Sequence, residues 1–174
     1  MTFWLEKEWQ ANTANEIQST LQHVHRRLAG QERGGKEWTV AVLQAFVPVA
    51  RGTCGDLAVC GLECPPDERC KGEWLYDFSC WVEGDGPGEG FLGLPIAVES
   101  EWGAWKDVWD DLDKLTQSRA GLRVFIFDAR WAPPDWHTIM SRRIRRFTLS
   151  QGDDAWLFAG WLSQGFDVRS GLAE

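Results

Sequence analysis

The sequence predicts an α/β domain in which a mixed sheet of about five strands is flanked by helices. Three observations support this fold class. Segments with apolar residues at helical spacing alternate with short apolar runs of strand length, and glycine- and proline-containing turns separate the two kinds of segment. No apolar run approaches the roughly 20 residues of a membrane span. At 174 residues the chain has room for one sizeable core, so residues 1–174 are expected to form a single domain.

Two helices are expected before the first strand. Thr13 and Glu16 have the spacing of a capping box, and Gly30 provides a helix stop. Between them, apolar residues recur at helical spacing: Ile17, Leu21, Val24 and Leu28. In the segment 37–50 the valines favour a strand, whereas the length of the run and the stop at Gly52 favour a helix. We predict a helix for this segment.

Three strands should follow, at 56–63, 73–83 and 91–102. The glycine-rich loop GDGPGEG joins the second to the third, which is typical of an antiparallel hairpin. Because side chains alternate between the two faces of a strand, Glu99 and Glu101 share one face, and Asp77 on the neighbouring strand can lie beside them.

The remaining elements alternate between helix and strand. A helix is expected over 105–120 with a stop at Gly121, and then a strand over 122–129 (LRVFIFDA) that is apolar enough to be covered on both faces. A helix over 135–149, a strand over 155–161 and a frayed tail complete the prediction.

The carboxylates in the second and third strands are the main functional signal. An acid inside an apolar strand is costly unless something compensates its charge, and a divalent metal is the usual compensation. Asp77, Glu99 and Glu101 therefore predict a site for Mg²⁺ or Mn²⁺, which is the chemistry of phosphodiester hydrolysis by an activated water. The alternative is that Asp77 is a structural, ion-paired group and that the two glutamates are the exposed end of a strand.

These residues resemble the core of the PD-(D/E)XK nuclease superfamily, the restriction-endonuclease-like fold. That core contains a helix, a three-stranded antiparallel meander, a second helix and a further strand, and the likeness covers roughly residues 13–130. YDFSCW supplies the Asp, and IAVESEW supplies the (D/E)-x-K element. The resemblance implies that Asp77 and Glu99 are the metal ligands and that the Ser100 carbonyl contributes.

The chain departs from the family pattern at two positions. Tyr76 stands where the family has proline, and Glu101 stands where it has lysine. Some restriction enzymes resembling this pattern carry Glu at that position and remain active. Lysine can also come from the following helix, where Lys114 is the candidate, although a helical wheel places Lys114 roughly 130° from the apolar stripe. A surface ion pair with Asp110 or Asp111 is the alternative for Lys114.

Two other groups of residues suggest binding. Arg142, Arg143, Arg145 and Arg146 form the best candidate for DNA contact in a chain of net charge −8, although a solvated helix face is the common reason for such a cluster. The cysteines Cys54, Cys60, Cys64 and Cys70 are spaced C-x5-C-x3-C-x5-C, which lacks the tight knuckles of structural zinc sites.

The leading hypothesis is a Mg²⁺-dependent nuclease cutting DNA, with Asp77, Glu99, Glu101 and Lys114 as the candidate catalytic residues. The second hypothesis is a catalytically inactive module with the same fold that binds a protein partner. The third is a zinc-binding module. The acidic N-terminal decapeptide does not have the apolar core of a secretory signal, so a cytoplasmic location and no membrane association are expected.

Overall fold

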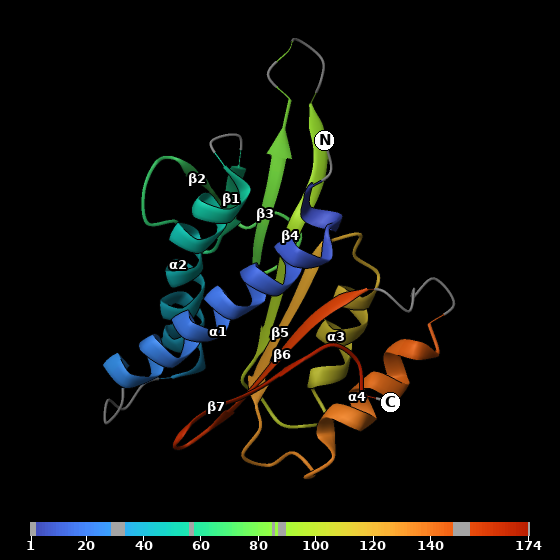
Figure 1. Cartoon of the computed structure of the whole chain (residues 1–174). Helices are drawn as coiled ribbons and strands as arrows, with labels where there is room; N and C mark the ends of the chain where they lie inside the picture. Colours follow the sequence, from blue (N-terminus) through green and yellow to red (C-terminus); the bar gives the residue numbers. More distant parts are fainter. Residues whose placement is uncertain are drawn as a thin grey trace.

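The computed structural model describes residues 3–28, 34–55, 58–84, 86, 90–147 and 154–173. These residues form a mixed sheet of seven strands with helices on both of its faces (Figure 1). The strand order is β2-β1-β3-β4-β5-β6-β7. The predicted α/β class is confirmed, and the sheet is larger than the five strands expected.

Helices α1 (Lys7–Leu28) and α2 (Gly35–Cys54) cover one face of the sheet. The predicted capping box at Thr13 is wrong, because α1 begins at Lys7 and Thr13 lies inside it, fully buried. The predicted stop at Gly30 lies outside the described residues. The helix predicted over 37–50 is confirmed, and its true N-terminus is marked by the Glu37 carboxylate, which accepts a hydrogen bond from the Gly34 backbone N–H.

The strands β1 (Ala58–Leu62), β3 (Phe78–Glu83) and β4 (Phe91–Glu101) form the predicted antiparallel meander. β2 (Cys70–Lys71) adds a short parallel strand at the edge. The strand predicted from residue 73 starts five residues late, because the ladder with β1 ends at the pair Leu62–Phe78 and leaves the preceding segment without a strand partner. The predicted start of the first strand at residue 56 and most of the glycine-rich loop lie outside the described residues.

β5 (Leu122–Asp128) runs parallel to β4, and β6 (Ala155–Leu162) runs parallel to β5. Every residue of β5 is buried, as its apolar sequence predicted. The frayed tail was a wrong prediction, because residues Gly165–Ser170 form β7, which pairs antiparallel with β6. A turn that ends at Gly165, with φ 149°, reverses the chain, and Phe166 is buried against the sheet.

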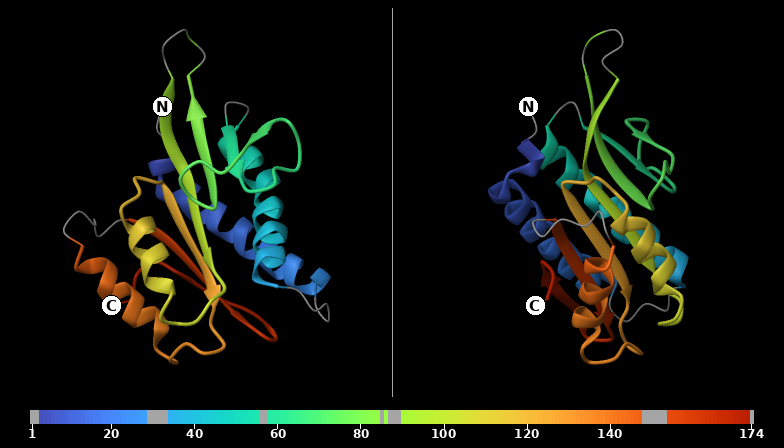
Figure 2. Two further views of the ribbon diagram at one scale, coloured as in Figure 1. Left: turned by 180° about the vertical axis from the view of Figure 1, so that it is seen from behind. Right: turned by 90° about the vertical axis from the view of Figure 1, so that its right-hand side faces the viewer.

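Helices α3 (Val108–Thr116) and α4 (Trp136–Arg145) cover the opposite face (Figure 2). Both are shorter than predicted, and the expected end of α4 at Leu149 lies outside the described residues. The alternation of side chains along the strands divides the interior into two cores, one under α1 and α2 and one under α3 and α4. Within the described residues, no helix is long and apolar enough to cross a membrane.

Candidate functional site

The candidate acids lie where β4 ends beside α3. Glu99 and Glu101 lie two residues apart in β4, so their side chains point to the same face of the strand. Ala97, two residues earlier, shares this face and packs in the core under α3 and α4. The predicted common face of the two glutamates is therefore confirmed. Helix α3 contacts both β4 and β5, which brings its own polar residues to the same end of the strand. The site is thus built from the start of β3, the end of β4 and one flank of α3.

Glu99 is the most perturbed group of the site. Its side chain is only 1 % exposed, and its Oε1 lies 2.7 Å from the Nζ of Lys114 without a well-aligned hydrogen bond. The pKa of Glu99 is raised to about 8, mainly by burial; the contact with Lys114 opposes this increase, and the nearby charge of Asp77 adds to it. One ammonium group therefore compensates the buried Glu99 only in part.

Lys114 reaches the acids despite its distance from the apolar stripe of α3. It contacts Glu99 instead of forming the alternative surface pair with Asp110 or Asp111. Burial lowers the pKa of Lys114, but the contact with Glu99 and the surrounding carboxylates outweigh this effect, so that the pKa lies above its ordinary value. Its ammonium also lies 5.6 Å from the centre of the buried Tyr76 ring.

Asp77 immediately precedes β3, so the prediction that it lies within a strand is wrong. The ladder between β3 and β4 ends at Phe78–Val98, one residue before Asp77 and Glu99 would face each other. The Asp77 carboxylate instead accepts two hydrogen bonds of 2.8 Å, from the backbone N–H and from the hydroxyl of Ser100. Asp77 is nevertheless close enough to raise the pKa of Glu99 by its charge.

Glu101 is half-buried, and its Oε1 accepts a hydrogen bond from the backbone N–H of Gly103 in the loop after β4. Sequence reasoning missed a fourth acid, Asp111 of α3. The pKa of Asp111 is raised to about 6, mainly by burial and also by the charges of Asp77 and Glu101. Its position three residues before Lys114 was the available signal, because residues i and i+3 of a helix are neighbours.

These side chains do not form a closed metal site. The described parts of the chain contain no group of three or more histidine, cysteine, aspartate or glutamate side chains arranged to hold a metal ion. Three of the four acids contact protein groups instead, namely Ser100, Lys114 and Gly103. The site is therefore a cluster of carboxylates in which Asp77, Glu99 and Glu101 each contact a different protein group.

The arginines of α4 divide into two classes. Arg143 forms a two-pronged ion pair with Asp113 of α3, and Arg145 donates to the carbonyl of Leu172. Arg142 and Arg146 line a hollow of about 240 Å³ together with Trp109, Ile139 and Arg143, and all four arginines are exposed. At about 100° per residue, Trp109 and Asp113 lie on the flank of α3 opposite to Asp111 and Lys114. The arginines and the acids therefore occupy opposite sides of this helix.

The predicted zinc ligands are not brought together as a set. Cys54, Cys60 and Cys70 are buried in the core under α2, whereas Cys64 is exposed. The fourth cysteine of the buried group is Cys80 of β3.

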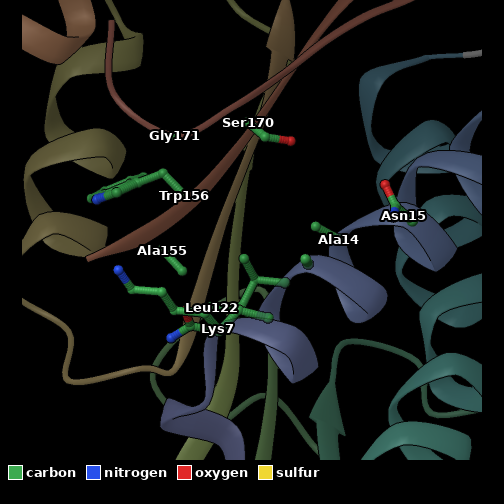
Figure 3. A pocket seen from close by; sticks show the side chains of 10 residues that line it. Lys7, Ala14, Asn15, Leu122, Ala155, Trp156, Ser170 and Gly171 are labelled. Carbon is green, nitrogen blue, oxygen red and sulfur yellow. The ribbon is translucent and has the colours of Figure 1, made fainter. Parts of the chain in front are cut away.

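A separate hollow of about 400 Å³ lies between the start of α1 and the strands β5, β6 and β7 (Figure 3). Small apolar groups such as Ala14, Ala155 and Leu122 form much of its lining, with Lys7 and Asn15 among the polar ones. Its lining, as far as the described residues show, contains no carboxylate, histidine or cysteine. It is not connected to the carboxylate cluster by any shared residue.

Comparisons of this chain with protein-family models, with curated proteins and with solved structures gave no match.

Proposed function

We propose that this protein is a Mg²⁺- or Mn²⁺-dependent nuclease that hydrolyses phosphodiester bonds in DNA. The observation that carries the proposal is the buried carboxylate Glu99, whose pKa of about 8 reflects burial beside further acids with a single lysine as counter-charge. A divalent cation compensates such an excess of negative charge better than one ammonium does. The order of elements, α2, the meander β1-β3-β4, α3 and then β5, supports a restriction-endonuclease-like core.

The available donors fit a hard cation. They are all carboxylate oxygens, the ligand type that Mg²⁺ and Mn²⁺ prefer, and no thiolate or imidazole takes part. Asp77 and Glu99 would hold the ion, and Asp111 is the nearest additional acid. When bound, the ion supplies Lewis-acid stabilisation and a water of lowered pKa.

The other residues of the site have complementary roles in this proposal. Glu101 would accept a proton from the attacking water, since it is half-buried at the open end of the strand. Lys114 would exchange its contact with Glu99 for the negative charge that develops on the phosphate. Its side chain is 38 % exposed and has a long flexible stem, so this exchange needs no movement of α3. Arg142 and Arg146 would contact phosphates farther along the strand.

Cleavage of plasmid and of single-stranded DNA in Mn²⁺ tests the proposal. Asp77→Ala and Glu99→Gln should each abolish cleavage, and calorimetry should show that both variants lose binding of Mn²⁺. Asp110→Asn is the matched control, because Asp110 is exposed on the same helix as Asp111 and its charge is the smallest of the influences on the pKa of Asp111. Cleavage that persists in both Asp77→Ala and Glu99→Gln would show that these acids are not the ligands.

A second function, binding of a protein partner by a catalytically inactive domain, is favoured by one observation. Trp74, Leu75, Phe91 and Leu92 are all more than half exposed around the β3–β4 hairpin. The Trp74 ring packs on Trp81 and on Phe91 at centroid distances of 5.4 and 5.7 Å, so it is held in place at the surface. Exposed apolar clusters commonly mark protein interfaces. Failure to bind Mg²⁺ or Mn²⁺ in calorimetry would favour this function over the nuclease.

A further inference from the structure

Four of the five cysteines gather beneath α2 from four different elements. Cys60 of β1 is the register partner of Cys70 on β2 and of Cys80 on β3, so the three residues form a row across adjacent strands. All three belong to the core on the α2 side of the sheet. Cys54, the last residue of α2, belongs to the same core. The chain thus concentrates its thiols in one buried place, and only Cys64 is exposed.

The spacing of this row is that of neighbouring strands. Residues directly opposite in an antiparallel pair have Cα atoms about 4.5 to 5.5 Å apart and side chains on the same face. A disulfide requires a Cα separation of about 4.4 to 6.8 Å. Cys60 and Cys80 therefore meet the backbone requirement for a disulfide, and the thiol of Cys80 contacts the thiols of both Cys54 and Cys60.

The same row is poorly suited to a single metal ion. The outer members, Cys70 and Cys80, are separated by two strand spacings, about 10 Å between Cα atoms, whereas a tetrahedral zinc holds each sulfur at about 2.3 Å. The guanidinium of Arg51 also lies 3.2 Å from the sulfur of Cys70 and repels a cation there. Among the residues that the structure describes, no cysteine group is arranged for a metal. A bond between two of the thiols is the chemistry that this geometry allows.

We propose that Cys60 and Cys80 are an oxidation site at which hydrogen peroxide forms a reversible disulfide between β1 and β3. The Cys60 thiolate attacks the O–O bond, which breaks to leave a sulfenic acid on Cys60 and, after protonation, one molecule of water. The Cys80 sulfur then displaces the sulfenic hydroxyl, which leaves as a second water with the proton of the Cys80 thiol. The two thiols lose two electrons and the peroxide gains them.

Three features of its surroundings favour this reaction at the pair. Cys60 has a thiol partner within contact, so that its sulfenic acid is resolved before further oxidation. The adjacent edge of the sheet is the two-residue strand β2, which needs little energy to open and admit a small oxidant. The guanidinium of Arg51 lies beside the row and favours a thiolate there.

Peptide mapping of the oxidised protein tests the pairing. The full chain carrying Cys64→Ser, which removes the exposed thiol, is treated with hydrogen peroxide, and remaining thiols are then alkylated in denaturant. Trypsin should release Cys60 within residues 52–69 joined to Cys80 within residues 72–106, and the intact mass should fall by that of two hydrogen atoms. The disulfide should raise the melting temperature by roughly 5 to 10 °C, and dithiothreitol should reverse the change.

Two matched variants identify the partner. Cys54→Ala should retain the cross-linked peptide, because its removal leaves Cys60 as the thiol in the 52–69 peptide of the Cys64→Ser background. Cys60→Ala should abolish it. A cross-link that persists in Cys60→Ala and disappears in Cys54→Ala would overturn the pairing, because it would place the bond between Cys54 and Cys80. Full alkylation of every thiol after peroxide treatment of the unsubstituted cysteines at 60 and 80 would overturn the oxidation site altogether.

Discussion

Replacement of Glu99 by glutamine should make the metal-free protein more stable at neutral and alkaline pH. The pKa of Glu99 is about 8 in the fold, against 4.5 for an ordinary glutamate. Between these two values the folded state binds more protons at this position than the unfolded state does, so the free energy of unfolding falls as the pH rises. The stabilising contribution of the protonated form is complete below pH 4.5 and is lost as the pH rises through 8.

The magnitude follows from the difference between the two pKa values. At 1.36 kcal/mol for each pH unit, the stabilising contribution of Glu99 falls by on the order of 3 kcal/mol by pH 7 and by 4 to 5 kcal/mol above pH 8, because the carboxyl group ionises at lower pH in the unfolded state than in the fold. Glutamine has nearly the same shape and carries no charge. For a domain of this size, about 3 kcal/mol corresponds to a melting temperature roughly 6 to 12 °C higher.

The assay is thermal and urea denaturation of the wild type and of Glu99→Gln from pH 4.5 to 9 in the presence of a chelator. The two curves should coincide near pH 4.5 and separate as the pH increases. Glu73→Gln, at an exposed acid outside the site, is the control and should follow the wild type throughout. If Glu99→Gln is less stable than the wild type at pH 8, the explanation of the raised pKa by burial is incorrect.

Three further substitutions test the packing around the site and in the two cores. Lys114→Met removes the partner of Glu99 and should lower the free energy of unfolding by about 1 to 3 kcal/mol at pH 9, where Glu99 is ionised. The loss should be smaller at pH 6, where Glu99 is protonated, and equal losses in urea titrations at the two pH values would contradict the pairing. Thr13→Val should stabilise the protein by about 1 kcal/mol in the same titration, because the buried Thr13 hydroxyl has no hydrogen-bond partner among the described residues. A loss of stability would mean that the hydroxyl is satisfied. Gly160→Ala should lower the free energy of unfolding by about 1 to 3 kcal/mol, since the added Cβ would lie 2.7 Å from the Cβ of Ala129. A melting temperature equal to that of the wild type would show that β6 can shift to accommodate the added methyl group.

Local sequence signals predicted most of the fold, and the errors have identifiable causes. The apolar continuity of LRVFIFD correctly placed β5 in the centre of the sheet. The capping-box pattern at Thr13 was outweighed by tertiary packing, because Trp4 packs in the core and α1 extends back towards it. The alternating side chains predicted for residues 73–77 favoured a strand, but a strand also needs a neighbouring strand to pair with. The neighbour β1 is only five residues long, so its pairing ends before Asp77. Pairing partners of this kind are not visible in the sequence of one segment.

The sequence also predicted part of the candidate site. The alternation of Glu99 and Glu101 along an apolar strand was sufficient to place both on one face. The orientation of Asp77 towards Ser100 and the reach of Lys114 to Glu99 depend on how α3 and the start of β3 pack on β4. Asp111 was missed because its sequence neighbours, Asp110 and Asp113, give it the appearance of one more surface acid in the first turns of a helix.

The length of β4 divides it into two parts with different protection from exchange with solvent. Residues Ile96 to Val98 pair with β3 on one side and with β5 on the other, and the pairing with β5 continues to Glu101. The residues near Phe91 pair only with β3 in the projecting hairpin (Figure 1). A two-stranded ribbon is marginally stable by itself. The amide of Phe91 should therefore exchange its hydrogen through local opening within minutes, while that of Val98 exchanges only when the whole domain unfolds, so that one continuous strand belongs to two cooperative units.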